Sequence, residues 1–141
     1  MFSMKWMLLP LKRYADFQGR SRRKEFWMFT LLVVIVYLAV CTLIVADEEV
    51  SGGAGLDGFT GLLGVAVALL GIGILIPSLA VQVRRFHDQD HSGWFVLLSF
   101  IPYIGGLIVL VFMCLPGTRG PNRFGPDPKE MEADALTETF R

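Results

Sequence analysis

The stretch 27-WMFTLLVVIVYLAVCTLIVA-46 contains no Asp, Glu, Lys, Arg or His. A helix rises about 1.5 Å per residue, so about 20 apolar residues cover the roughly 30 Å hydrocarbon core of a bilayer. Two further runs, 59–83 and 94–115, are also free of charge and long enough to cross. All three are apolar on every side, as a helix immersed in lipid requires. The sequence therefore predicts an all-α, polytopic membrane protein with three transmembrane helices.

Composition supports a membrane protein with one domain. The 141 residues are 53% hydrophobic and 18% charged, and the mean hydropathy is +0.53. Such values argue against a soluble helical bundle and leave little chain for a soluble catalytic fold. The first run starts too late in the chain for a signal peptide and lacks its small-residue cleavage site. We expect a membrane domain over 1–128, with an interfacial segment at 1–26 and an ordered tail motif at 116–128, followed by a flexible tail at 129–141.

Positive charge gathers on one side of the first run. Seven cations precede it: Lys5, Lys12, Arg13, Arg20, Arg22, Arg23 and Lys24. The loop 47–58 that follows it has no Lys or Arg, and its charges are all acidic: Asp47, Glu48, Glu49 and Asp57. Because loops rich in Lys and Arg stay in the cytoplasm, the N-terminus is predicted to be cytoplasmic and the loop 47–58 to be a solvated outer turn.

The first 18 residues mix apolar and aromatic side chains with cations. Trp6 and Phe17 can enter the headgroup boundary while Lys12 meets anionic lipid. This pattern predicts a short amphipathic segment on the cytoplasmic membrane surface. Trp27 and Trp94, which begin the first and third runs, are expected to anchor those helices at the interface.

Small residues follow one stripe of the second run. The residues expected to pack against another helix are Gly64, Ala68, Gly71 and Ser78. Small side chains let two helices approach closely, and the alternative is a ligand groove along the same stripe. Pro77 lies in this run, where it is expected to kink the helix and free a carbonyl near the level of Ser78.

The third run carries Pro102, Gly105 and Gly106 near its middle. It can therefore be one kinked span or a re-entrant hairpin. Each arm of a hairpin would have only about ten residues, well short of the roughly 20 needed to cross, so we favour a single span kinked at Pro102 and Gly105. A third crossing would place the irregular, Pro- and Gly-rich tail on the outer side.

Three motifs border the apolar runs: FQGRSRRKEFW at 17–27, PSLAVQVRRFHDQDHSGW at 77–94 and PGTRGPNRFGPDP at 116–128. Together they resemble the DUF 805 family of YhaH-like bacterial inner-membrane proteins. The resemblance implies a bacterial inner-membrane location and topology, but no mechanism, because the family has no assigned function. The family's motif positions correspond here to Gly19, Arg20, Arg23, Glu25, Phe26, Trp27, Arg84, Arg85, His87, Asp88, Ser92, Gly93, Trp94, Pro116, Gly117, Asn122 and Gly125.

The second loop, 84-RRFHDQDHSGW-94, is the densest polar cluster. Arg84 and Arg85 are four and three residues before Asp88, a spacing at which side chains on a helix can pair. Glu25 can pair with an arginine from either loop. These pairs would fix the helix ends, which is the structural interpretation of the cluster.

The functional interpretation depends on the excess of cations. Six basic residues can form a pocket that binds the phosphate of an anionic lipid or a membrane partner: Arg20, Arg22, Arg23, Lys24, Arg84 and Arg85. Three neighbours would orient them: Glu25, His87 and Asp88. The resulting hypothesis is a non-enzymatic accessory or binding component that needs no cofactor and has no nucleic-acid partner.

Two other functional classes remain as alternatives. A homo-oligomer can line a channel or small-solute pore with its glycine-rich second helix, and another membrane protein can occupy the same stripe. A metal-dependent membrane enzyme can use His87 and His91, four residues apart, with Asp88 or Asp90 as a third ligand, although the H-E-x-x-H pattern is absent. No ionisable residue lies inside the three runs, which argues against a proton-coupled carrier.

Overall fold

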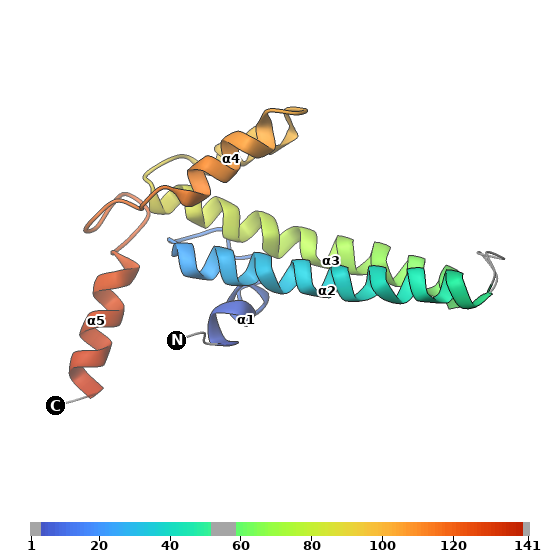
Figure 1. Ribbon diagram of the computed structural model, residues 1–141. Helices are drawn as coiled ribbons and strands as arrows, with labels where there is room; N and C mark the ends of the chain where they lie inside the picture. Colours follow the sequence, from blue (N-terminus) through green and yellow to red (C-terminus); the bar gives the residue numbers. More distant parts are fainter. Residues whose placement is uncertain (1–3, 52–58, 140–141) are drawn as a thin grey trace.

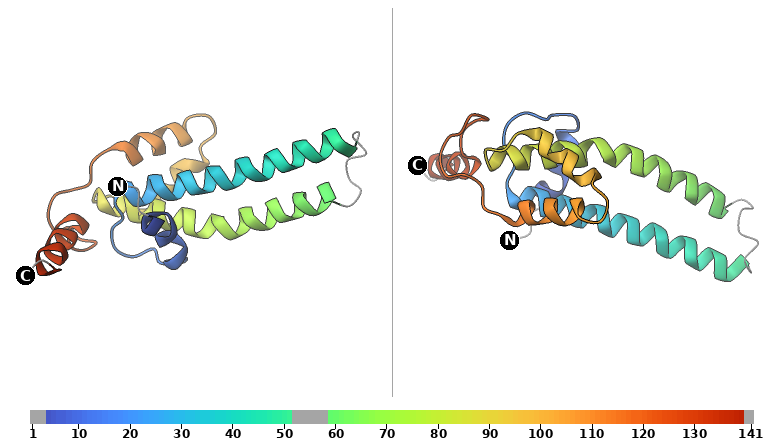
Figure 2. Two further views of the ribbon diagram at one scale, coloured as in Figure 1. Left: turned by 60° about the horizontal axis from the view of Figure 1, so that its bottom comes forward. Right: turned by 90° about the horizontal axis from the view of Figure 1, so that it is seen from above.

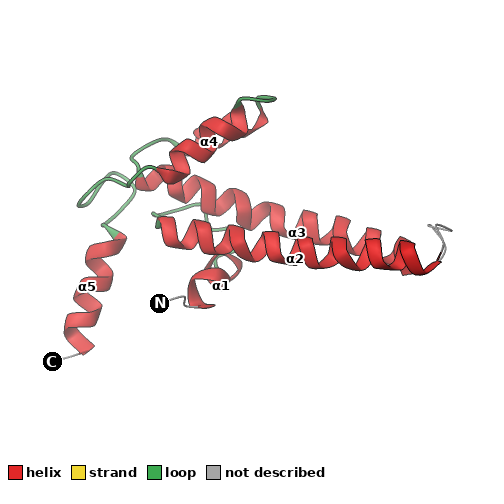
Figure 3. Ribbon diagram, viewed as in Figure 1, coloured by secondary structure: helices red, strands yellow, loops and turns green. Residues whose placement is uncertain are grey.

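The computed structural model describes residues 4–51 and 59–139, and its regular elements within those ranges are all helical (Figure 3). In chain order they are α1 (Met4–Lys12), α2 (Arg23–Ser51), α3 (Phe59–Asp88), the 3₁₀ helix η1 (Gly93–Phe100), α4 (Gly105–Cys114) and α5 (Pro128–Thr139). The all-α prediction is confirmed. Residues 52–58 of the predicted outer turn lie outside the described ranges.

Helices α2 and α3 lie side by side as a long pair (Figures 1 and 2). Their segments Arg23–Ala46 and Gly61–Asp88 are long and apolar enough to cross a bilayer, yet only 6% of the most apolar window of each is buried inside the protein. Leu38 and Leu69 are 62% and 64% exposed. A soluble protein covers the apolar faces of its core helices, so these faces require lipid around them. The first two predicted spans correspond to this pair.

The third apolar run reverses direction. It begins as η1, turns at residues 101–104 and returns as α4, so that the two pieces form a hairpin (Figure 1). At the turn Tyr103 adopts the left-handed conformation, with a φ of 65°. Gly105 lies so close to the carbonyl of Leu98 that a Cβ would overlap it. Each arm reaches roughly 15 Å, about half of a bilayer core. The predicted single kinked span over 94–115 is not confirmed, because Pro102 and the residues after it reverse the chain instead of bending it.

Both ends of the hairpin lie at the same end of the helix pair. The side chain of Gln89, just after α3, donates a hydrogen bond to the carbonyl of Phe112 in α4. The backbone N–H of Thr118 donates to the carbonyl of Asp88 at 2.8 Å. Figure 1 shows α5 and the C-terminus at the end of the pair where α1 lies. The tail therefore lies at the same end of the helix pair as the N-terminal segment, and its predicted position across the membrane from that segment is not confirmed.

A small apolar core joins the hairpin to the end of α3. Phe86, Val109 and Met113 are buried there, and Phe26 of α2 packs against them. Burial of each such side chain contributes about 1.5–3 kcal/mol. The core fixes the base of the hairpin, whereas Tyr103 at its tip is fully exposed.

Helix α1 packs beside the first part of α2 and also touches α3 (Figure 2). Pro10 lies inside α1 and is buried, whereas Met4 and Leu8 are exposed. The chain then returns toward α2 through Gly19, which adopts a φ of 78° that glycine accepts without strain. This return brings the basic segment before α2 onto the end of α3.

Residues 129–139, where we expect a flexible tail, are helical in the structure as part of α5. The carboxylate of Asp127 accepts the backbone N–H of Lys129 at 2.9 Å, and Pro128 is the first residue of the helix. Aspartate just before a helix and proline at its first position both favour a helix start. This local pattern accounts for α5.

Candidate functional site

A buried ion pair joins the beginning of α2 to the end of α3. The guanidinium of Arg84 lies 3.1 Å from the carboxylate of Glu25, and the two side chains are 0% and 4% exposed. Among the described residues, no hydrogen bond of good geometry reaches the Arg84 guanidinium. The pairing of Glu25 with an arginine from the other loop is confirmed. Removing either partner would leave a buried charge without compensation, so the pair functions as a fixed link between the helices.

Asp88 holds two arginines. Its carboxylate accepts a hydrogen bond of 3.0 Å from the Nε–H of Arg20 and forms an ion pair with Arg85, three residues earlier in α3. Arg20 comes from the segment before α2, so this triad joins that segment to the end of α3. Both arginine side chains are 1% exposed or less. The predicted pairing of Arg85 with Asp88 is confirmed, and Arg84 pairs with Glu25 instead.

The same arginines hold the tail. Arg20 donates to the carbonyls of Thr118 at 2.6 Å and Gly120 at 2.7 Å, and Arg85 donates to the carbonyl of Leu115. At Gly117 a Cβ would overlap the carboxylate of Asp88, so only glycine permits this approach.

The tail also covers the last carbonyls of α3. The amide of Asn122 donates to the carbonyl of His87 at 2.9 Å, and the Thr118 hydroxyl donates to that of Asp88 at 3.1 Å. These contacts satisfy helix-end groups that have no partner inside the helix. The ring of Phe124 stacks on His87 with centroids 3.9 Å apart.

Two histidines of the second loop face different surroundings. The Nδ1 of His87 lies 3.2 Å from the carbonyl of Gly19, whereas His91 packs edge-on against Phe95 and Phe112. Among residues 4–51 and 59–139, no group of three His, Cys, Asp or Glu side chains is placed to hold a metal ion. The His87–Asp88–His91 metal hypothesis therefore receives no support from the geometry.

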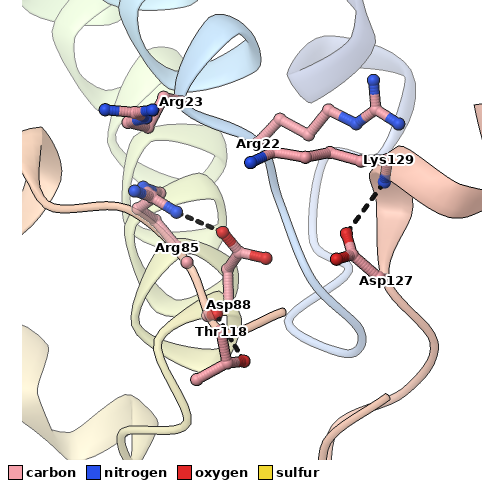
Figure 4. Close-up of a pocket in the computed structure, with 8 residues that line it drawn as sticks. Arg22, Arg23, Arg85, Asp88, Thr118, Asp127 and Lys129 are labelled. Carbon is pink, nitrogen blue, oxygen red and sulfur yellow. Dashed lines mark hydrogen bonds and ion pairs between the residues drawn. The ribbon is translucent and has the colours of Figure 1, made fainter. Parts of the chain in front are cut away.

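Arg22, just before α2, and Arg23, its first residue, have side chains that diverge. In Figure 4 their side chains extend to opposite sides, while Arg85 turns toward Asp88. Arg23 donates to the carbonyl of Cys114 at 3.2 Å and is exposed. Lys24 is exposed as well.

A surface groove of about 470 Å³ follows Arg23 along α2; it is lined by Arg23, Lys24, Trp27, Met28 and Cys114, and we name it the collar groove.

On the other side, Arg22 pairs with Glu132 of α5 and lies over the ring of Trp6, 5.7 Å from its centroid. The small cavity between these sides, bordered by Asp88, Thr118 and Asp127, has a volume of about 20 Å³ and fits a water molecule at most.

The predicted interface anchors are exposed, with Trp27 40% and Trp94 77% accessible. Only part of the predicted packing stripe on α3 contacts α2. A Cβ at Gly71 would lie 3.0 Å from the Tyr37 hydroxyl of α2, whereas one at Gly64 would meet nothing within 4 Å. Ala68 is exposed.

Ser78, from the same stripe, lines a cavity of about 210 Å³ between α2 and α3, together with Thr30 and Gln82.

Two residues that fix the tail and the N-terminal segment were missed by the sequence interpretation. Asp127 accepts the backbone N–H groups of Lys129 and Gly120, which hold the pKa of its carboxyl below the usual value. An Asp-Pro pair before a polar helical stretch is the signal that could have found it. Tyr14 donates to a backbone carbonyl of α3 at Gly73, a contact 59 residues apart with no local sequence signal.

Comparison with known proteins identifies the family. A sequence model of the family described as "Protein of unknown function (DUF805)" matches residues 14–126. The chain is 47% identical over 128 residues to the inner membrane protein YhaH of Escherichia coli strain K12, covering 89% of this chain and 98% of that protein. It is 42% identical over 130 residues to the inner membrane protein YhaI of the same strain, covering 89% and 97%. No solved structure matches the chain. The matched residues include the whole arginine cluster.

Proposed function

Because this chain belongs to the DUF805 family and its relatives are inner membrane proteins, we propose that it is a two-span inner-membrane protein with both terminal segments in the cytoplasm. The seven cations before the first apolar run support this orientation, as does the acidic loop at 47–58. The hairpin enters the membrane from the cytoplasmic side and returns. The tail then adds Arg119 and Arg123 to the same face.

At that face the protein binds the phosphate headgroup of an anionic lipid in the collar groove, as a non-enzymatic component. One observation carries this proposal. Arg20, Arg84 and Arg85 are buried and paired with Asp88 or Glu25, so they build the fold, whereas Arg23 and Lys24 are exposed and carry no ion pair within the described residues.

The collar groove has the composition that a lipid requires. Its two cations meet phosphate, and Trp27 and Met28 present apolar surface one turn deeper toward the hydrocarbon. Each cation near an anionic surface contributes about 1 kcal/mol. The proposed lipid-binding residues are therefore Arg23 and Lys24, fewer than the six expected from the sequence. Glu25 and Asp88 form ion pairs with the buried arginines.

Native mass spectrometry of the purified protein with cardiolipin and phosphatidylglycerol tests this proposal. The double variant Arg23→Gln/Lys24→Gln should lower retention of both lipids about 30-fold, which corresponds to about 2 kcal/mol. Arg119→Gln provides the matched control, because Arg119 is an exposed cation outside the groove. Equal retention by the double variant and the control would disprove headgroup binding in the collar groove.

A further inference from the structure

A second and larger cleft lies on the opposite side of α2 from the collar groove. It has a volume of about 500 Å³, and three parts of the chain enclose it: α1, the basic segment before α2, and the tail with α5. This volume is within the range of pockets that hold small molecules. We name it the α1–α5 cleft.

The polar part of the α1–α5 cleft centres on Arg22. Its side chain is 11% exposed, and one guanidinium nitrogen pairs with Glu132. Its Nε and Nη2 are buried and have no hydrogen-bond partner among the described residues. Buried donors without acceptors are costly, so this guanidinium favours a further anionic acceptor. Lys5 adds an exposed ammonium to the same cleft.

The other cations of the cleft are already neutralised. Arg13 pairs with Asp16 at 2.6 Å, and Arg20 pairs with Asp88 at 3.0 Å. They strengthen the positive field but do not need a ligand. Arg22 therefore remains the main contact for an anion.

The rest of the wall is apolar. Trp6 and Leu9 of α1 face the cleft from one side, and Phe124 and Met131 face it from the tail and α5. An inorganic ion would leave these side chains uncovered. A ligand with one anionic head and a single hydrocarbon chain covers both parts, and the position of α1 beside the start of a membrane span puts the cleft within reach of such molecules (Figure 2).

We propose that the α1–α5 cleft binds a single-chain anionic amphiphile, with a phosphate head at Arg22 and Lys5 and its chain against Trp6 and Met131. Glu132 occupies the anion position on Arg22 in the unliganded protein. Its side chain is 48% exposed, so the ion pair is weak and a phosphate displaces it. The site is separate from the collar groove, and either site can exist without the other.

Quenching of Trp6 fluorescence tests the proposal. The chain has three tryptophans, so the full-length Trp27→Phe/Trp94→Phe protein retains Trp6 alone. In phosphatidylcholine nanodiscs, brominated lysophosphatidate should quench Trp6 saturably. A brominated monoacylglycerol, which has no charge, should bind at least tenfold more weakly. Inorganic phosphate should compete only weakly, because it does not cover the apolar wall.

Variants of the polar contacts complete the test. Arg22→Gln and Lys5→Gln should each raise the dissociation constant for lysophosphatidate several-fold, while Glu132→Gln should lower it and Arg119→Gln should leave it unchanged. Lys5 is exposed, so Lys5→Gln decides the matter if Arg22→Gln fails to fold. Equal binding of the neutral amphiphile, undiminished binding by Lys5→Gln, or full competition by inorganic phosphate would overturn the proposal.

Discussion

The hydroxyl of Tyr14 donates a hydrogen bond of 2.6 Å to the backbone carbonyl of Gly73, midway along α3. Four residues after Gly73 stands Pro77, which has no N–H, so the carbonyl of Gly73 lacks its normal helical donor. An unsatisfied carbonyl in a membrane-spanning helix is costly, and Tyr14 supplies the missing donor. This contact ties the N-terminal segment to the membrane span.

Replacing Tyr14 with Phe should destabilise the protein by about 1 kcal/mol, the typical net value of such a hydrogen bond. Chemical unfolding in detergent micelles measures the change. In a Pro77→Ala background the helix regains its own donor at position 77. Tyr14→Phe should then have almost no effect, and an equal loss in both backgrounds would show that Tyr14 does not compensate for Pro77.

Asp88→Asn should destabilise the folded protein by about 3 kcal/mol or more, because it leaves two buried arginines, Arg20 and Arg85, without their carboxylate. Asp90→Asn is the matched control. Asp90 also pairs with an arginine, Arg123, but both side chains are about half exposed, so the loss should be less than about 1 kcal/mol. Similar unfolding free energies for the two variants would contradict the structural role of the buried triad.

Acidification should release α5. The backbone N–H of Lys129, and then that of Gly120, hold the pKa of Asp127 below its ordinary value of 3.8. A lowered pKa in the folded state means that the carboxylate stabilises the tail above pH 3.8 and that this contribution is lost as the pH falls through the folded pKa.

Spin labels at Lys12→Cys and Glu138→Cys, with Cys41 and Cys114 replaced by Ala, measure the separation of α1 and α5. The Glu132→Gln background removes the second acidic group that holds α5. The separation should widen below about pH 4, and Asp127→Asn should weaken this dependence because its side chain does not titrate. If Asp127→Asn shows the same widening on acidification, a group other than Asp127 causes the transition.

The two long spans could be predicted from the length of the charge-free runs. The pair of Arg85 with Asp88 could be predicted from its local spacing, whereas the partner of Glu25 could be narrowed only to an arginine of either loop. The third run shows the limit of a length criterion. It is long enough to cross, but Pro102 and Gly105 near its middle permit a complete reversal, and the choice depends on packing around Phe86, which length does not reveal.

The divided roles of the cations could not be predicted from the sequence. The seven basic residues before the first apolar run read as one cluster, yet Arg20 is buried against Asp88, 68 residues away, and Arg23 is exposed. The difference arises because the tail returns to the end of α3 and offers its carbonyls to Arg20. Such long-range partners leave no periodic signal in the chain.

The topology itself can be measured by labelling spheroplasts with a membrane-impermeant maleimide. Single cysteines at Lys12, Glu49 and Arg119 are introduced after Cys41 and Cys114 are replaced by Ala. Two spans and a cytoplasmic hairpin predict that Glu49→Cys is labelled, while Lys12→Cys and Arg119→Cys are protected until the membrane is permeabilised. Labelling of Arg119→Cys from outside, with Lys12→Cys protected, would show that the third run crosses the membrane and would contradict the account.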